Sequence, residues 1–217
     1  MTNQKIIVID YGSGNLASVH NALELIKNSD QEILISNNPV DLELATHIIL
    51  PGVGAFGDCI SSLKAIPKMK ETLENQVLKY KKPFLGICVG MQLLADIGYE
   101  YGENRGLGFI QGKVVRIDDQ NGVLKIPHMG WNNLEVKPNI HPVLVDIKTG
   151  DHVYFVHSYY FIPSNEDEVV AYAEYGKKIT AIIARDNIIA TQFHPEKSDK
   201  IGLKLLKNFI NWKYIPA

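Results

Sequence analysis

Residues 86–90, with the sequence Gly-Ile-Cys-Val-Gly, constrain the fold more than any other part of the chain. An apolar run at 83–85 precedes them and a helical pattern at 91–95 follows. A strand, a nucleophilic side chain near glycines and then a helix form a nucleophile elbow, here with a sulfur atom. The turn is so tight that glycine is expected on both flanks. It places Cys88 at a helix N-terminus, where the helix dipole favours the reactive thiolate.

The alternative interpretation of Cys88 is a buried structural cysteine, because cysteine is among the residues most often buried. The elbow context favours catalysis over packing. Cys59 provides the contrast, since no glycine flanks it in the sequence. We expect Cys59 to be a small core or helix residue.

Apolar, β-branched runs alternate with helical patterns in the first half of the chain. Strands are predicted at 6–9, 32–35 and 47–50 before the elbow strand, and helices at 16–26, with Asn15 as N-cap, and at 68–80. This alternation predicts a mostly parallel sheet with helices on both faces.

The second half has a different pattern. Short β runs between turn residues extend from 106 to 174 and predict an added antiparallel sheet. A hairpin is predicted for 182–184 and 188–190, followed by a final helix over 200–212. Because no repeat or linker interrupts the 217 residues, we expect one domain spanning residues 1–217.

Charge and cysteine content narrow the function classes. The net charge of −2 gives no electrostatic case for nucleic acid or an acidic membrane surface, and no apolar run approaches the length of a membrane span. The N-terminal apolar run is too short for a signal peptide. Two cysteines without C-x-x-C spacing favour a reducing, cytoplasmic setting, and they do not match a zinc spacing with the scattered histidines.

A cysteine nucleophile needs a base, and the base needs a group to orient it. His194 is the strongest candidate of the seven histidines, because it follows the second hairpin strand and begins His194-Pro195-Glu196. Glu196 can accept a hydrogen bond from the imidazole and leave the other ring nitrogen facing the sulfur. The alternative is a surface His-Pro-Glu turn.

An acyl-transfer site also needs donors for the developing oxyanion. Residues 51–54, with the sequence Pro-Gly-Val-Gly, follow the third predicted strand at the edge where such a site would lie. The glycines allow backbone amides to approach a ligand, and a peptide there could flip at modest cost. The alternative is a simple strand-ending turn.

At this point the residues resemble a known family. The elbow and the His-Pro-Glu motif resemble class I (triad) glutamine amidotransferases, and within that class the chain is similar to the glutaminase subunits of imidazole glycerol phosphate synthase. The more selective motifs are Asp-Tyr-Gly-Ser-Gly-Asn-Leu at 10–16 and Pro-His-Met-Gly-Trp-Asn at 127–132, and a further one is Phe-Val-His-Ser-Tyr at 155–159. The resemblance implies a flavodoxin-like three-layer α/β fold.

The resemblance also implies a function. The family hydrolyses glutamine to glutamate and ammonia, and the ammonia passes into a (β/α)8-barrel cyclase subunit, the partner in a heterodimer of histidine biosynthesis. No metal or organic cofactor is implied. Cys88 would attack the glutamine side-chain amide, His194 would supply the proton of the leaving ammonia, and Glu196 would orient His194.

Further positions are assigned by the same resemblance. The oxyanion pocket would be lined by Gly52, Val53 and Val89. Substrate glutamine would be contacted by Gln92, Glu100, Ser158 and Tyr159, with Glu100 meeting the α-ammonium group. The barrel partner would be faced by Asn15, Trp131, Asn132, Tyr154 and Lys197. For Glu100 an exposed loop acid, and for Trp131 simple packing under its loop, are the alternatives.

Three other functions remain open at this level. A paralogue could feed ammonia to a different synthase with an unchanged triad. A cysteine hydrolase of the same elbow architecture is more distant, because Gln92 and the His-Pro-Glu motif speak against it. A binding module that lost the chemistry is opposed by the intact Cys88, His194 and Glu196.

Overall fold

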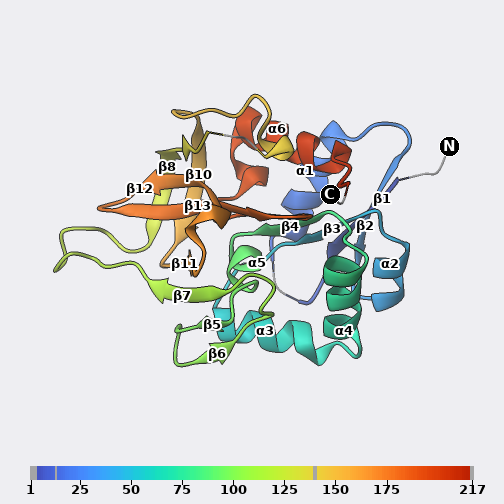
Figure 1. The fold of residues 1–217 in the computed structure, drawn as a ribbon, viewed down its shortest axis with the longest axis horizontal. Coiled ribbons are helices and arrows are strands. Elements are labelled where there is room, and N and C mark those ends of the chain that lie inside the picture. Colours follow the sequence, from blue (N-terminus) through green and yellow to red (C-terminus); the bar gives the residue numbers. More distant parts are fainter. Residues whose placement is uncertain (1–3, 13, 139–140, 216–217) are drawn as a thin grey trace.

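A large twisted sheet runs through the molecule and separates two layers of helices (Figure 1). The computed structural model describes residues 4–12, 14–138 and 141–215. The sheet has eight strands in the order β2-β1-β3-β4-β14-β13-β12-β9. Their bounds are β1 Gln4–Ile9, β2 Gln31–Ser36, β3 His47–Leu50, β4 Phe84–Ile87, β9 Glu135–Val136, β12 Val169–Glu174, β13 Lys178–Arg185 and β14 Ile188–Thr191.

The central strands are buried on both faces because helices cover each side of the sheet. Strands β3, β4 and β14 are buried at every residue, as expected for continuous apolar runs in a parallel sheet. One face carries α1 (Leu16–Ile26) and α6 (Asp199–Asn211), which pack against each other. The other face carries α2 Pro39–Leu44, α3 Phe56–Ala65, α4 Met69–Glu74, the π-helix η1 Asn75–Lys79 and α5 Val89–Gln92 (Figure 1).

The strand order confirms the predicted flavodoxin-like class. The order 2-1-3-4 with parallel pairings is that of a doubly wound sheet, and β14 continues it in parallel beside β4. The predicted hairpin is present as β13 and β14, paired antiparallel from Ile182↔Thr191 to Arg185↔Ile188. Strand β12, which the sequence suggested for an added sheet, instead extends the main sheet beside β13.

Two small sheets hold the remaining strands. One pairs β8 (His128–Asn133) with β10 (His152–His157), antiparallel. The other has the order β11-β7-β5-β6. The strands of this sheet are β5 Ile97–Gly98, β6 Asn104–Arg105, β7 Gly112–Arg116 and β11 Tyr159–Pro163. Outside the sheets, short 3-10 helices lie at η2 Pro142–Leu144, η3 Glu166–Glu168 and η4 Pro195–Lys197.

Two local expectations differ from the structure or are met by it in part, and a third is met in full. The helix predicted at 68–80 is α4 continued by the wider turns of η1, and the sequence pattern did not predict α2 or α3. Asn15 stands at the N-cap position of α1, but its side chain makes no capping hydrogen bond there. As expected, Cys59 is a buried helix residue, on α3.

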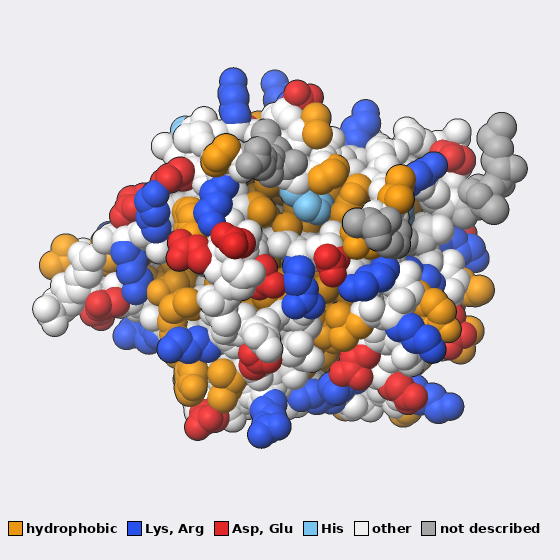
Figure 2. Space-filling view, viewed as in Figure 1, with side chains coloured by type: hydrophobic (Ala, Val, Ile, Leu, Met, Phe, Trp, Pro, Cys, Tyr) orange, Lys and Arg blue, Asp and Glu red, His pale blue; other side chains and the backbone are white. Residues whose placement is uncertain are grey.

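The fold brings the ends of three parallel strands together at one edge. The segments after β3, β4 and β14 all leave the sheet at the carboxyl edge, where ligands bind in open α/β sheets. Within the described ranges, no helix combines the length and apolarity needed to cross a bilayer. Side chains of both charges are interspersed over the face seen in Figure 2.

Candidate active site

Cys88 stands on a strained turn between β4 and α5. Its backbone angles are φ 54° and ψ −110°, a conformation that L-residues rarely adopt, and its amide donates to the Thr191 carbonyl at 2.7 Å. The nearby glycines leave no room for a side chain. A Cβ on Gly90 would lie 1.8 Å from the Leu50 carbonyl oxygen, and one on Gly86 would lie 2.8 Å from the Gly90 carbonyl oxygen. The close approach of β3, β4 and α5 therefore depends on these glycines.

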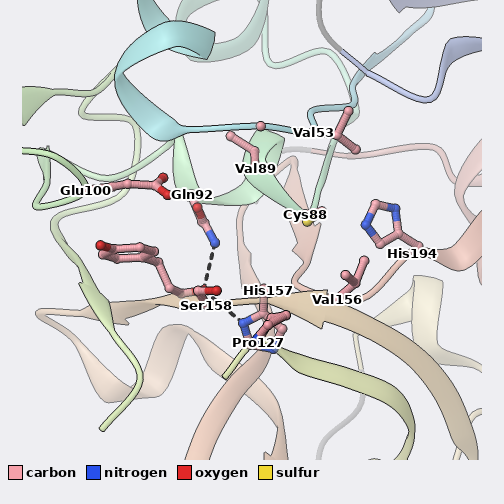
Figure 3. Close-up of a pocket in the computed structure, with 12 residues that line it drawn as sticks. Val53, Cys88, Val89, Gln92, Glu100, Pro127, Val156, His157, Ser158 and His194 are labelled. Carbon is pink, nitrogen blue, oxygen red and sulfur yellow. Dashed lines mark hydrogen bonds between the residues drawn. The ribbon is translucent and has the colours of Figure 1, made fainter. Parts of the chain in front are cut away.

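His194 and Glu196 lie next to the elbow, because β14, the strand that precedes them, pairs with the elbow strand β4. His194 follows β14, and its backbone amide donates to the Tyr154 carbonyl on β10 at 3.0 Å. Its Nδ1 bonds Glu196 Oε1 at 2.7 Å, and both side chains are almost fully buried. The other ring nitrogen, Nε2, is buried and has no hydrogen-bond partner among the described residues. The imidazole and the Cys88 sulfur lie near each other on the same pocket wall (Figure 3).

The surroundings of His194 favour its charged form. Burial acts to lower the pKa of His194, but the interactions with Cys88 and Glu196 outweigh it and raise the pKa to about 10. An imidazolium beside the sulfur stabilises a thiolate, which is the nucleophilic form of cysteine. The arrangement therefore places a ring that favours its charged form beside the sulfur.

Asn15 contacts this group from the start of α1. Its Nδ2 donates to Glu196 Oε1 at 3.2 Å, the same oxygen that His194 bonds. Two hydrogen bonds to one oxygen fix the carboxylate, while Glu196 Oε2 is buried without a described partner. The family resemblance assigned Asn15 to the partner-facing surface, and no pattern in the sequence indicated its contact with Glu196.

The Pro-Gly-Val-Gly segment lies directly over the elbow. The Tyr11 hydroxyl donates to the Pro51 carbonyl at 2.8 Å, and the Cys59 thiol donates to the Val53 carbonyl at 3.5 Å. The Val89 amide, an expected oxyanion donor, donates instead to the Gly52 carbonyl at 3.3 Å. In this conformation the Gly52 carbonyl occupies the position that an oxyanion would take on that amide.

A pocket of about 320 Å³ opens beside the thiol (Figure 3). Glu100 reaches it from the loop after β5, and its Oε2 accepts the amide of Phe56 at 2.8 Å, which anchors the carboxylate to the N-terminus of α3. The lining brings together predicted residues from distant parts of the chain: Val53, Cys88, Val89, Gln92, Glu100, Ser158, Tyr159 and His194. It also includes four residues that the sequence did not predict for the site: Gly54, Pro127, Val156 and His157. Gly52, the remaining predicted oxyanion residue, lies behind this wall and is buried.

Gln92 connects two sides of the pocket. Its Nε2 donates to the Tyr159 carbonyl at 2.9 Å and to Gln192 Oε1 at 3.1 Å. Gln192, fully buried, in turn points its Nε2 to the Cys88 sulfur at 3.8 Å. Sequence reasoning missed Gln192. The available signal was a polar residue between the apolar strand β14 and His194.

The residues predicted to face a partner lie around the His194 side of the pocket. Trp131 on β8 is 55% exposed, and its ring stands edge-on to Tyr154 at 6.2 Å between centroids. Lys197 is exposed directly after Glu196. Asn132 is partly buried and donates to the Glu174 carbonyl at 2.8 Å. An exposed tryptophan beside polar groups suits an interface anchor.

Histidine, cysteine and carboxylate side chains are the groups that would bind a metal ion. Within residues 4–12, 14–138 and 141–215, no three His, Cys, Asp or Glu side chains gather as a metal-binding group. Cys59 and Cys88 are both buried thiols, and neither belongs to a disulfide bond.

The fold and site define a class of protein. The family model described as glutamine amidotransferase class-I matches residues 7–212. Solved structures share the fold: that of PurLQS from Thermotoga maritima has a TM-score of 0.72 at 19% identity and covers 96% of this chain and 98% of that one. The glutaminase domain of Trypanosoma brucei CTPS, solved with bound acivicin, has a TM-score of 0.64 at 15% identity, covering 98% and 96%.

Closer sequence relatives narrow the class to one family. The imidazole glycerol phosphate synthase subunit HisH of Rhodospirillum rubrum is 48% identical over 211 residues, which covers 96% of this chain and 99% of that protein. The HisH subunit of Cereibacter sphaeroides is 47% identical over 209 residues, with 95% and 98% covered. The chain belongs to the HisH family within the class-I glutamine amidotransferases.

Proposed function

We propose that this protein is the glutaminase subunit of an imidazole glycerol phosphate synthase and that Cys88, His194 and Glu196 carry out the hydrolysis. The observation that supports this most directly is the convergence of the elbow thiol with a buried His–Glu pair bonded at 2.7 Å. Family membership supplies the substrate, glutamine, and the synthase.

The reaction follows from the positions of these groups. The Cys88 thiolate attacks the side-chain amide carbon of glutamine, and the C–N bond breaks as His194 gives its proton to the leaving ammonia. Water then attacks the thioester, His194 takes the proton from that water, and glutamate leaves as the thiolate reforms. Glu196 holds the imidazole in the tautomer and orientation that both proton transfers need.

Binding of glutamine uses the remaining pocket residues. We assign the Glu100 carboxylate to the α-ammonium group, and its position in the pocket lining with Gln92, Ser158 and Tyr159 supports this. Opposite charges in a partly buried pocket fix the orientation of the substrate more strongly than at an exposed surface.

The oxyanion segment acts as a switch in this proposal. A flip of the Gly52–Val53 peptide removes the Gly52 carbonyl from the Val89 amide and turns the Val53 amide toward the thiol. The amides of Val53 and Val89 then both face the oxyanion. In the present conformation the Val89 amide is occupied by the Gly52 carbonyl. Loss of one such donor typically costs a factor of about 10²–10³ in rate. The isolated subunit is therefore a poor glutaminase that its partner activates.

The partner is a (β/α)8-barrel cyclase subunit that receives the ammonia and forms a heterodimer with this chain. The exposed Trp131 and Lys197 and the partly buried Asn15, Asn132 and Tyr154 form the docking face, which borders the triad. Residues 1–217 act as one domain, and one hydrophobic core that includes residues from β1 to α6 supports this. Two buried thiols that share no disulfide bond support a cytoplasmic, reducing setting.

The test is a glutaminase assay on this chain alone and on its complex with the barrel subunit, in the presence of the nucleotide ligand. Glutamine turnover should rise by about 10²–10³ in the complex. Equal turnover by the isolated chain would remove the switch. Glutamate release without synthesis of imidazole glycerol phosphate would point to a paralogue that serves another ammonia acceptor.

A variant separates the two half-reactions. In the complex, Cys88→Ala should abolish synthesis from glutamine and leave synthesis from ammonium salt, because the barrel subunit can use free ammonia. Cys59→Ala is the matched control, a second buried thiol that should leave glutamine-dependent synthesis in place. Loss of ammonium-dependent synthesis in Cys88→Ala would contradict this division of labour.

A further inference from the structure

Two buried histidines lie next to the pocket, and the reaction described above gives them no role. His128 is the first residue of β8 and His157 is the last residue of β10, and they stand opposite each other in the antiparallel pair. His128 Nδ1 and His157 Nε2 are 3.0 Å apart. The His128 ring is stacked between Phe155, at 4.7 Å, and Tyr175, at 4.1 Å between centroids. Both histidines are therefore held rigidly in place.

The pair continues at each end into a chain of hydrogen bonds. At the inner end, His157 Nδ1 bonds the Tyr159 carbonyl at 2.9 Å, and that carbonyl also accepts Gln92 Nε2 (Figure 3). At the outer end, Asn132 Nδ2 bonds His128 Nε2 at 3.2 Å. This series of hydrogen bonds therefore runs from the β8 face, beside the exposed Trp131, to the lining of the pocket.

The direction of every hydrogen bond between Asn132, His128, His157 and the Tyr159 carbonyl is fixed. The Asn132 Oδ1 accepts the Asn133 amide at 2.8 Å and its Nδ2 donates to the Glu174 carbonyl, so Nδ2 is a donor and His128 Nε2 is an acceptor. At the other end, the Tyr159 carbonyl can only accept, so His157 Nδ1 carries a hydrogen. With both rings neutral, His128 Nδ1–H then donates to His157 Nε2.

The buried position agrees with this neutral state. Burial lowers the pKa of His128 to about 4 and that of His157 to about 3. At neutral pH both rings can therefore act as donor at Nδ1 and acceptor at Nε2. A proton added to the pair would leave a donor facing a donor and break the chain.

We propose that His128 and His157 are positioning residues that hold the Tyr159 carbonyl, and through it Gln92, in the shape that binds glutamine. This rests on the proposed glutaminase function. The pair touches no reacting atom. It sets the Ser158–Tyr159 segment and the amide of Gln92, which in turn bonds Gln192 beside the Cys88 sulfur. Loss of the pair should therefore weaken glutamine binding more than it slows the chemical step.

Two substitutions at one position separate the two hydrogen bonds. In His157→Asn the side-chain amide can replace Nδ1 and keep the bond to Tyr159, while the bond to His128 is lost. In His157→Gln the amide oxygen can replace Nε2 and keep the bond to His128, while the bond to Tyr159 is lost. The two variants are close in size and polarity, so a difference between them reports the hydrogen bond.

The assay is glutamine hydrolysis by the complex with the barrel subunit. In His157→Gln we expect the KM for glutamine to rise about tenfold, the factor that one buried hydrogen bond supplies, with kcat changed less than about threefold. In His157→Asn we expect a smaller rise, below about threefold. Equal effects of both variants, or an equal fall in kcat with KM unchanged, would overturn the proposal. Wild-type complex without glutaminase activity would instead refute the proposed function.

A measurement on the wild-type chain needs no variant to fold. Nitrogen-15 NMR of histidine-labelled protein at pH 7.5 should show both rings neutral and protonated at Nδ1. A ring protonated at Nε2, or on both nitrogens, would contradict the assigned direction of the hydrogen bonds and overturn the proposal. Alkylation of Cys88 provides a further check, because His157→Gln should slow a glutamine-mimicking electrophile and not iodoacetamide.

Discussion

Replacement of Glu196 by glutamine tests the electrostatics of the triad directly. The carboxylate bonds His194 at 2.7 Å, and both side chains are at most 2% exposed. A rise in the His194 pKa from 6.5 to about 10 corresponds to about 5 kcal/mol of preference for the charged ring. A carboxylate at this distance typically supplies about 1–3 pKa units of such a change. We therefore expect Glu196→Gln to lower the pKa of His194 by about 1–3 units.

The assay is a pH titration of the His194 ring by nitrogen-15 NMR in the wild type and in Glu196→Gln. Glu24→Gln is a matched control, because it removes a carboxylate from the partly exposed pair with His20 on α1. The control should leave the His194 titration unchanged. Wild-type His194 titrating near 6.5, or at the same pH with and without the Glu196 carboxylate, would refute the reasoning.

The same shift predicts how stability depends on pH. Because the pKa of His194 is higher in the folded state than in the unfolded state, the stabilisation from the charged ring is complete below about pH 6.5. It is lost as the pH rises toward about 10. Urea unfolding between pH 6 and 9.5 should show that the free energy of unfolding falls less with rising pH in Glu196→Gln than in the wild type.

Three further predictions concern the elbow and the pocket. Gly90→Ala should destabilise the fold by about 3 kcal/mol in urea unfolding, because its Cβ would lie 1.8 Å from the Leu50 carbonyl oxygen; an unchanged midpoint would contradict the close approach. Glu100→Gln should raise the KM for glutamine by about tenfold or more. The unfolding midpoint should be retained, because the new amide oxygen can still accept the Phe56 amide at the start of α3. An unchanged KM would remove the role of Glu100 at the α-ammonium group. A glutamine-mimicking electrophile should label Cys88 and not Cys59, as read by peptide mass spectrometry, and labelling at Cys59 would contradict the assignment.

The sequence predicted the parts of the molecule that depend on local pattern. The elbow at Cys88, the parallel strands and the hairpin before His194 follow from apolar periodicity and glycine spacing, and the structure contains all three. The triad pairing of His194 with Glu196 followed because the two residues are close in sequence. Prediction of the remaining site residues depended on family resemblance, because they come from loops far apart in the chain.

Contacts between distant segments could not be predicted from the sequence. The Asn15 side chain looked like a helix cap, but it makes no capping hydrogen bond and instead donates from Nδ2 to the Glu196 carboxylate. Strand β12 looked like part of an added sheet, but its pairing with β13 is decided by the edge that the hairpin exposes. His128 and His157 carried no signal of their partnership, because strand register alone places them opposite each other.

The position of β14 in the sheet has a consequence for the nascent chain on the ribosome. Cys88 emerges during synthesis well before His194, yet β14 lies between β4 and β13, directly beside the elbow strand. Until this late strand inserts, His194 is not held beside the thiol. In the proposed mechanism, a nascent chain that still lacks β14 therefore cannot hydrolyse glutamine.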